Sequence, residues 1–160
     1  MNSRLLSIVT AVVLGALGAC QTGTEPGTVD DLELTTSLSR TVIPAGETAV
    51  MQMRLRNRGT STVTLDFPSS CQILPYIQAA GGSSVFPTGG GWGCLTVITK
   101  LVLEPGEEVV QTLEIRGGTP APTISTGAQL APGQYRAFAE LGERPRPYVK
   151  SNSVSFSVVE

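Results

Sequence analysis

Short stretches in which apolar and polar residues alternate recur along this chain, with turn-forming residues between them. In the stretch from Ala49 to Asn57, for example, Met51, Met53 and Leu55 alternate with polar residues. Successive side chains of a β-strand point to opposite faces of the sheet, so this pattern predicts strands with one apolar face. Eight strands are predicted, within residues 32–39, 49–57, 63–67, 71–79, 95–103, 109–116, 135–141 and 151–159. Residues 95–103 are dense in Val, Ile and Thr, and we expect this strand to be buried on both faces.

The stretch from Leu130 to Leu141 combines a turn signal with a strand. Pro132-Gly133 suits the two central positions of a type II turn, because Pro presets φ and Gly tolerates a positive φ. In the strand that follows, Tyr135 shares one face with small apolar residues. A tyrosine at the start of such a strand resembles the tyrosine corner of Greek-key sandwiches, in which the phenol bonds a backbone group just upstream. We therefore assign Tyr135 a structural role.

Composition agrees with many short strands in one domain. The chain has 160 residues, among them 18 Gly and 11 Pro, which is long enough to bury a core. Strands and turns follow one another about every ten residues. The predicted fold is therefore all-β, an immunoglobulin-like antiparallel β-sandwich of about 7–8 strands.

The chain begins with a leader. Arg4 precedes an apolar run of thirteen residues, Leu5 to Leu17, which is shorter than the about 20 residues needed to span a bilayer. Leu17-Gly18-Ala19-Cys20 resembles the lipobox of bacterial lipoproteins, in which the Cys is acylated and becomes the new N-terminus. We predict a lipoprotein signal peptide at residues 1–19, lipidation of Cys20, a flexible tether at 20–30 and the domain at 31–160. An ordinary secretory signal with Cys20 paired elsewhere, or an uncleaved core helix, are the alternatives.

The lipobox implies a membrane partner through the acylated Cys20, and so a place at the cell envelope. Gln21 and Thr22 are not the Asp that retains enterobacterial lipoproteins at the inner membrane. In a host with two membranes this favours the outer membrane, with the domain facing the periplasm. Without Arg4 the chain has ten basic and thirteen acidic side chains, a net charge of −3, which does not suggest a nucleic-acid partner. No oligomeric state follows from these patterns.

Two further cysteines, Cys71 and Cys94, remain. Outside the cytoplasm such a pair is expected to form a disulfide, whose loop closure contributes about 3 kcal/mol. Two free thiols are an alternative, whereas redox chemistry is disfavoured because no Cys-x-x-Cys is present. The Gly-rich loop at 81–93 carries Phe86 and Trp92. Trp92 is interpreted either as a cap on the core edge beside the disulfide or, with Phe86, as an exposed anchor for a partner.

Two other features are candidate partner surfaces. Pro145 and Pro147 stiffen the loop that carries Arg146 and Tyr148, and rigid loops lose less entropy on binding. A simple hairpin connection is the alternative for this loop. Arg54, Arg56 and Arg58 alternate along one face of a strand, which indicates a solvated outer face or a stripe for an anionic partner.

Catalytic patterns are missing from the sequence. The chain has no His, which excludes His-based triads and His metal ligands. Neither Lys100 nor Lys150 has a Ser three residues before it, so no Ser-x-x-Lys nucleophile exists. Asp30-Asp31-Leu32-Glu33 is not followed by calcium-loop spacing. We predict that the protein is not an enzyme and has no catalytic residue, metal or cofactor.

Four segments together resemble a known family. They are Met53-Arg54-Leu55-Arg56-Asn57, Val63-Thr64-Leu65-Asp66-Phe67, Leu103-Glu104-Pro105-Gly106-Glu107, and Leu130-Ala131-Pro132-Gly133-Gln134-Tyr135 with Ala137 and Ala139. Over roughly Asp31 to Leu141 their order is similar to the BsuPI family of bacterial intracellular proteinase inhibitors. The resemblance implies an Ig-like sandwich and, as in the founding members, inhibition of serine proteinases by surface binding.

The sequence departs from that family in two ways. Its lipoprotein leader means that an intracellular proteinase is not its partner, and Cys71 and Cys94 replace a stretch where the family continues with a Gly-Trp-like hairpin. No inhibitory residue can be transferred. We expect a lipid-anchored, Ig-like domain that binds a protein partner at the envelope as a proteinase inhibitor. The alternative is an assembly module of an envelope complex without inhibitory activity, and ligand or ion binding is a third hypothesis.

Overall fold

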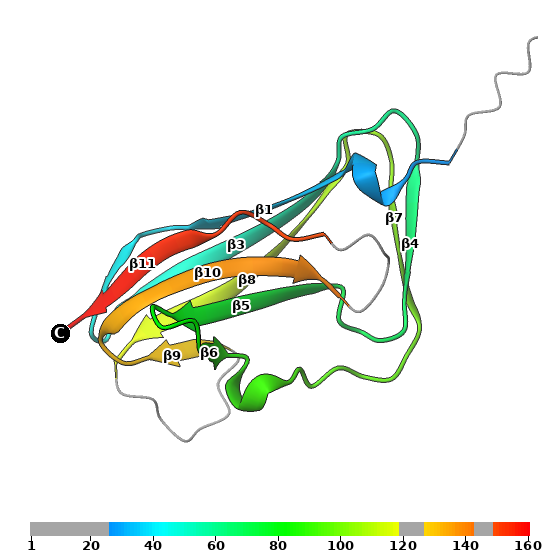
Figure 1. Cartoon of the computed structure of the whole chain (residues 1–160). Coiled ribbons are helices and arrows are strands. Elements are labelled where there is room, and N and C mark those ends of the chain that lie inside the picture. Colours follow the sequence, from blue (N-terminus) through cyan, green and yellow to red (C-terminus); the bar gives the residue numbers. More distant parts are fainter. Residues whose placement is uncertain (1–25, 119–126, 143–148) are drawn as a thin grey trace, which may run out of the picture.

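Two β-sheets face each other across an apolar core, and a two-stranded ladder closes one end of the sandwich (Figure 1). The structure is a computed structural model that describes residues 26–118, 127–142 and 149–160. Its strands are β1 Leu32–Leu38, β2 Val42–Pro44, β3 Thr48–Asn57, β4 Val63–Phe67, β5 Ile73–Ala79, β6 Ser84–Phe86, β7 Thr99–Leu103, β8 Glu108–Gly117, β9 Ala128–Leu130, β10 Gly133–Leu141 and β11 Val154–Val159. Two 3₁₀ turns, η1 Val29–Asp31 and η2 Thr88–Gly90, complete the described elements.

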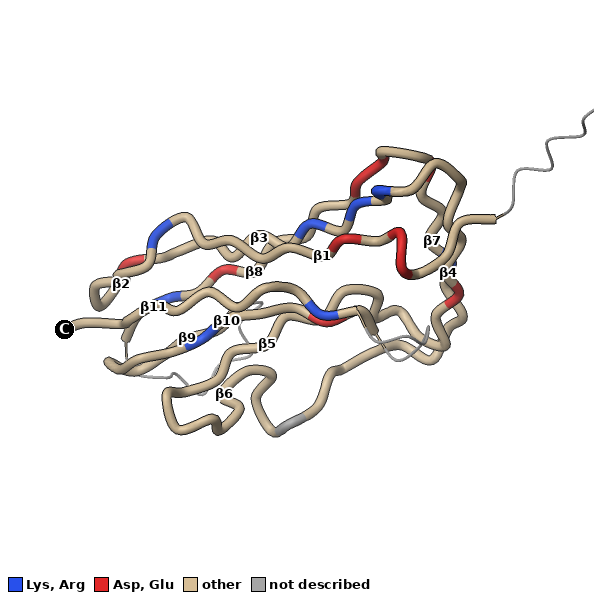
Figure 2. The backbone as a smooth tube through the Cα atoms, turned by 45° about the horizontal axis from the view of Figure 1, so that its top comes forward, with Lys and Arg blue, Asp and Glu red and all other residues tan. Residues whose placement is uncertain are grey.

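The strand order is β1-β3-β8-β9 in one sheet and β2-β11-β10-β5-β6 in the other, with β4-β7 as the ladder. Figure 2 shows the two layers from the side, with β3 and β8 in one and β5 and β10 in the other. The main pairings are antiparallel, as predicted, but β2 runs parallel to β11 and β9 runs parallel to β8. The all-β sandwich is confirmed. Its strand count is higher than predicted, because β2, β6 and β9 are three-residue edge strands too short to show an alternating pattern.

The predicted alternation accounts for the core. Met51, Met53 and Leu55 of β3 are at most 1% exposed. The same holds for the apolar face of β4, where Val63, Leu65 and Phe67 are at most 2% exposed. Burial of one such apolar side chain stabilises the fold by about 1.5–3 kcal/mol. This inner face is what brings the two sheets together.

The prediction for residues 95–103 is wrong in two respects. Only Thr99–Leu103 forms a strand, and the segment before it is exposed rather than buried on both faces: Leu95 is 70% and Ile98 80% exposed. Thr99 pairs with Phe67, the last residue of β4. Pro68 follows Phe67 and has no N–H to continue a ladder, so residues before Thr99 have no strand to pair with.

The predicted type II turn at Pro132-Gly133 is also wrong. Gly133 does not have a positive φ; it opens β10 and pairs with Val158. A Cβ at Gly133 would lie 3.3 Å from the hydroxyl oxygen of Tyr135. The glycine therefore makes room for the Tyr135 ring two residues further on the same face. The related sequence Glu104-Pro105-Gly106 does form such a turn, with φ of 80° at Gly106 and the Glu107 N–H donating to the Glu104 carbonyl at 2.9 Å.

Residues before Asp31 also contact the domain. The amide of Gly27 donates to the carbonyl of Thr62 at 3.0 Å, and Val29 packs against the core. The backbone N–H of Thr28 donates to the Asp31 carboxylate at 2.7 Å. Residues 27–30, which were predicted to belong to the tether, are thus held against the start of β4.

A buried asparagine organises the closed end of the sandwich. Asn57 is fully buried, and its side-chain N–H₂ donates to the carbonyls of Ser61 and Leu103, both at 2.9 Å. Its side-chain carbonyl accepts the Gly59 N–H at 2.9 Å. The end of β3, the loop after it and the end of β7 are thereby joined by one side chain.

Candidate functional site: the disulfide-anchored segment

The predicted disulfide between Cys71 and Cys94 is formed, with the two Cα atoms 5.5 Å apart. Cys71 lies between β4 and β5, and Cys94 lies between η2 and β7. The bridge joins residues 23 positions apart in the chain. It fixes the start of the segment Cys94–Ile98, which has no strand partner of its own.

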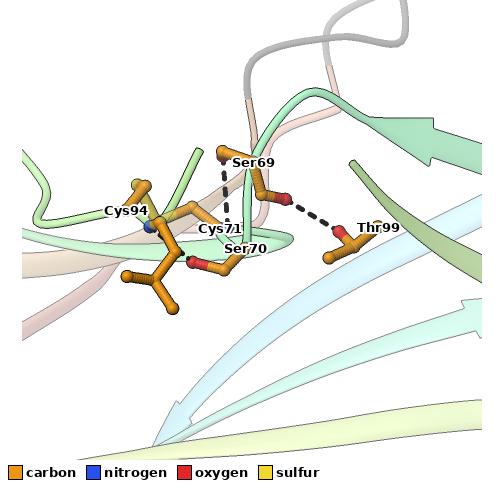
Figure 3. The surroundings of a disulfide bond; sticks show 6 residues. Ser69, Ser70, Cys71, Cys94 and Thr99 are labelled. Atoms are coloured by element: carbon orange, nitrogen blue, oxygen red, sulfur yellow. Dashed lines mark hydrogen bonds between the residues drawn. A yellow bond between two sulfur atoms is a disulfide. The ribbon is translucent and has the colours of Figure 1, made fainter. Parts of the chain in front are cut away.

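Hydrogen bonds hold the same segment against residues 69–71 (Figure 3). The Ser70 N–H donates to the Leu95 carbonyl at 3.0 Å, and the Leu95 N–H donates to the Ser70 hydroxyl at 2.9 Å. At the other end, the Thr99 hydroxyl donates to the Ser69 carbonyl at 2.7 Å. The disulfide and three hydrogen bonds therefore fix both ends of the Cys94–Ile98 segment to residues 69–71.

The side chains of this segment face solvent. Leu95 is 70%, Val97 48% and Ile98 80% exposed. The Val97 N–H donates to the Leu95 carbonyl at 2.9 Å, which turns the backbone at Thr96. No charged residue occurs from Cys94 to Thr99. The arrangement is a rigid, uncharged stretch that presents aliphatic side chains.

An aromatic cluster lies beside the segment, on the outer face of β5 and β10. The Trp92 ring stands edge-on to Phe86 and to Tyr76, with centroids 5.3 and 5.9 Å apart. Tyr76 stacks on Phe138 at 5.4 Å, and the Lys150 ammonium lies 3.7 Å from the Phe138 ring centroid. Phe86 and Trp92 are both half-buried and pack on each other. The buried indole N–H of Trp92 has no acceptor among the described residues.

An open pocket of about 490 Å³ separates the cluster from the clamped segment. Leu74 and Tyr76 of β5 form one side, Trp92, Cys94 and Thr96 another, and Pro68 and Ser69 lie at the edge. Cys94 and Thr96 both line the pocket, whereas Leu95 between them is exposed. The pocket and the exposed side chains are therefore neighbouring parts of one surface.

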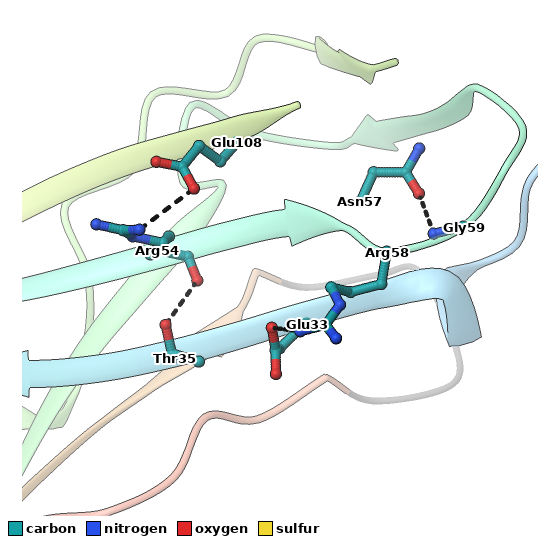
Figure 4. A network of polar contacts seen from close by, with 7 residues as sticks. All are labelled: Glu33, Thr35, Arg54, Asn57, Arg58, Gly59 and Glu108. Atoms are coloured by element: carbon teal, nitrogen blue, oxygen red, sulfur yellow. Dashed lines mark hydrogen bonds and ion pairs between the residues drawn. The ribbon is translucent and has the colours of Figure 1, made fainter. Parts of the chain in front are cut away.

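The predicted arginine stripe is exposed and largely paired (Figure 4). Arg58 donates to Glu33 at 2.8 Å, and Arg54 to Glu108 at 3.4 Å. Arg56 is exposed. These are surface ion pairs, each contributing up to about 1 kcal/mol.

Tyr135 has the geometry of a tyrosine corner. Its hydroxyl donates to the Ala131 carbonyl at 2.7 Å, four residues upstream, and its ring stacks on Phe156 with centroids 5.5 Å apart. Burial raises the pKa of the Tyr135 phenol above its ordinary value of 10.0. Tyr135 therefore joins the turn between β9 and β10 to the neighbouring strand β11.

Three predicted site residues, Cys20, Arg146 and Tyr148, lie outside the described residues. Within the described ranges, no group of three or more His, Cys, Asp or Glu could hold a metal ion. In the same part of the chain no helix is both long and apolar enough to cross a bilayer. Leu95 and Ile98 were not predicted as site residues, because their aliphatic run suggested a buried strand; Pro68, which ends the partner strand, was the available signal.

Comparison with solved structures shows likeness in fold at low identity. A CARDB domain from Pyrococcus furiosus is 20% identical, with 81% of this chain and 94% of that chain covered and a TM-score of 0.44. A β-glucosidase from Erythrobacter marinus is 16% identical, with 80% of this chain covered and a TM-score of 0.43. The chain spans only 15% of that enzyme and 16% of a similar β-glucosidase from Listeria innocua.

No curated protein matches the chain. The family model described as BsuPI, intracellular proteinase inhibitor, matches residues 36–146. The match runs from β1 past the end of β10 and includes both cysteines of the disulfide. The chain therefore belongs to the BsuPI family of intracellular proteinase inhibitors.

Proposed function

We propose that this protein is a proteinase inhibitor that acylated Cys20 tethers to the bacterial cell envelope, where its folded domain binds a proteinase by surface contact. The family match over residues 36–146 is the observation that carries the proposal. A sandwich with rigid, exposed loops suits inhibition by contact, since a preorganised surface loses little entropy on binding.

Two features support a place outside the cytoplasm, although the family description reads "intracellular". Leu17-Gly18-Ala19-Cys20 follows an apolar run in the manner of a lipobox. The Cys71–Cys94 disulfide is of the kind that forms and persists in oxidising compartments. The partner would then be a proteinase of the envelope or of the surrounding medium, and the outer membrane facing the periplasm is the favoured place in a host with two membranes.

An inhibition assay tests the proposal. The purified full-length protein, kept in detergent micelles, is titrated against a panel of serine proteinases that includes subtilisin, chymotrypsin and trypsin. Inhibition of at least one enzyme at micromolar concentration or below is the expected result. If micromolar protein leaves the whole panel active, and pull-down from envelope extract yields a stoichiometric partner without proteinase activity, the assembly-module reading replaces the inhibitor.

A further inference from the structure

We propose that the Cys94–Ile98 segment is the surface that contacts the proteinase, with Leu95 and Ile98 as the side chains that enter the enzyme. This inference rests on the proposed function and deepens it. The partner is an endoproteinase whose primary specificity pocket is apolar and takes a large aliphatic side chain, in the way that a hydrophobic slot sets specificity in chymotrypsin.

Exposure and charge single out this segment. Leu95 and Ile98 are the two most exposed large apolar side chains among the described residues, at 70% and 80%. Their segment has no charge, whereas Asp66 and Lys100 at its edge form an exposed ion pair at 3.6 Å. Binding surfaces have this composition: the core of an interface lacks charged residues, and a polar rim surrounds it.

The segment is also held in place without a partner. The disulfide fixes Cys94, both backbone polar groups of Leu95 bond to Ser70, and the Thr99 hydroxyl bonds to Ser69. A loop kept in one conformation does not pay the ordering cost again on binding.

The position of the segment leaves it accessible in a tethered protein. The described chain begins beside Thr62, where the Gly27 amide bonds, at the Val63–Leu103 end of the β4–β7 ladder. The segment enters the opposite end of that ladder at Thr99, which pairs with Phe67 (Figure 1). Residues between Cys20 and Pro26 span at most about 22 Å. A membrane anchor at Cys20 would therefore connect to the domain at the Val63–Leu103 end of the ladder, and Leu95 and Ile98 lie beyond its other end.

The neighbouring pocket adds a second contact point. Cys94 and Thr96 line this hollow of about 490 Å³ together with Trp92, while Leu95 between them is exposed. An interface that both inserts side chains and receives one is more complementary than a flat surface. The proteinase can thus place a side chain of its own beside Trp92 while it accepts Leu95 or Ile98.

Charge substitutions test the assignment on the full-length protein in detergent micelles. Leu95→Asp and Ile98→Asp are each assayed against subtilisin, chymotrypsin and trypsin. We expect the wild-type protein to inhibit the enzymes with apolar specificity pockets, and each variant to raise the inhibition constant at least about 30-fold, the loss typical of a central interface residue.

Val42→Asp is the matched control. Val42 is an aliphatic residue that is 54% exposed on β2, in the end of the molecule away from β4 and β7 (Figure 2). We expect its inhibition constant to change less than about 3-fold. Leu95→Ala and Ile98→Ala form a second pair that removes the side chains without adding charge; each is expected to weaken inhibition about 10-fold with an unchanged thermal midpoint.

The outcomes separate this inference from the proposed function. If the wild-type protein inhibits and all four variants at Leu95 and Ile98 inhibit equally well, the segment is not the contact and only this inference is overturned. Selective inhibition of trypsin would likewise contradict an apolar specificity pocket. If the wild-type protein inhibits no proteinase, the proposed function fails and the assignment of the segment fails with it.

Discussion

Asn57 is a polar side chain in the core with every hydrogen-bonding group used. Its amide bonds the carbonyls of Ser61 and Leu103 and the N–H of Gly59, all at 2.9 Å. A buried polar group is tolerated only when it is paired in this way, and removing its partner leaves a desolvated group that costs about 1–3 kcal/mol. The asparagine therefore contributes to the closed end of the sandwich on the same scale as a buried aliphatic side chain.

Asn57→Ala is expected to lower the free energy of unfolding by about 2–4 kcal/mol, because two carbonyls and one N–H lose their partner. Urea unfolding followed by circular dichroism measures the change. Thr60→Ala, at an exposed position in the same loop, is the control and should change stability by less than about 0.5 kcal/mol. Equal stability of Asn57→Ala and the wild-type protein would contradict the role assigned to this side chain.

We expect the ionisation of Tyr135 to lower the stability of the protein at alkaline pH. Because burial raises the pKa of its phenol above 10.0, the folded state holds the proton more tightly than the unfolded chain. The contribution of this group is fully present below about pH 10 and is lost as pH rises through the folded-state pKa. Urea midpoints measured from about pH 8 to about pH 11 should therefore fall at the alkaline end.

Tyr135→Phe isolates this contribution from other titrating groups. At neutral pH the variant should be about 1 kcal/mol less stable, since the bond to Ala131 is lost while the stacking on Phe156 remains. The gap between wild-type and variant should narrow above about pH 10. If the stability difference between the wild-type protein and Tyr135→Phe widens as pH rises, burial does not raise the pKa of this phenol.

Among the elements, β7 and the segment before it depend most on the disulfide. Cys71→Ser with Cys94→Ser removes a cross-link between residues 23 positions apart, and loop-closure entropy predicts a loss of about 3 kcal/mol. The thermal midpoint of the double variant measures this loss. Dithiothreitol should lower the midpoint of the wild-type protein by a similar amount and leave the double variant unchanged; a further fall in the double variant would point to a different cause.

The long strands were predicted from the sequence, whereas the three-residue strands were not. β3, β4 and β8 alternate over five or more residues, and their buried faces could be predicted from period two alone. In β10 the alternation predicted the inner face, but Phe138 on the opposite face is buried as well. Residues 95–98 have the composition of a buried strand, yet burial needs a facing layer, and β4 ends at Phe67. The candidate contact side chains Leu95 and Ile98 were missed for that reason, whereas the disulfide beside them could be predicted from the cysteine count and the leader.

For the molecule as a whole, the proposed anchor at Cys20 is tested by localisation. Cys20→Ser is expected to move the protein from the membrane fraction to the soluble fraction, because acyl chains contribute about 0.8 kcal/mol for each buried methylene. Immunoblots of fractionated cells measure this, and globomycin should block processing of the wild-type protein alone. Inhibition by the variant in solution should be unchanged, since residue 20 precedes the described domain. A wild-type protein that is soluble and unacylated would contradict the anchor.

The sequence was sufficient for the all-β class, the family, the disulfide and most inner-face residues. Alternation and turn chemistry indicate strands and their faces because they act between near neighbours in the chain, and the disulfide followed from the cysteine count and the leader. Folding in three dimensions settled which strands meet. In the folded protein Leu95 and Ile98 are exposed, and Gly133 is a strand residue that lies against the Tyr135 ring. Asn57 is buried and joins the end of β3 to the end of β7. Those outcomes depend on contacts between residues far apart in sequence, such as Asn57 with Leu103 and Ser70 with Leu95, and no periodicity within one segment encodes them.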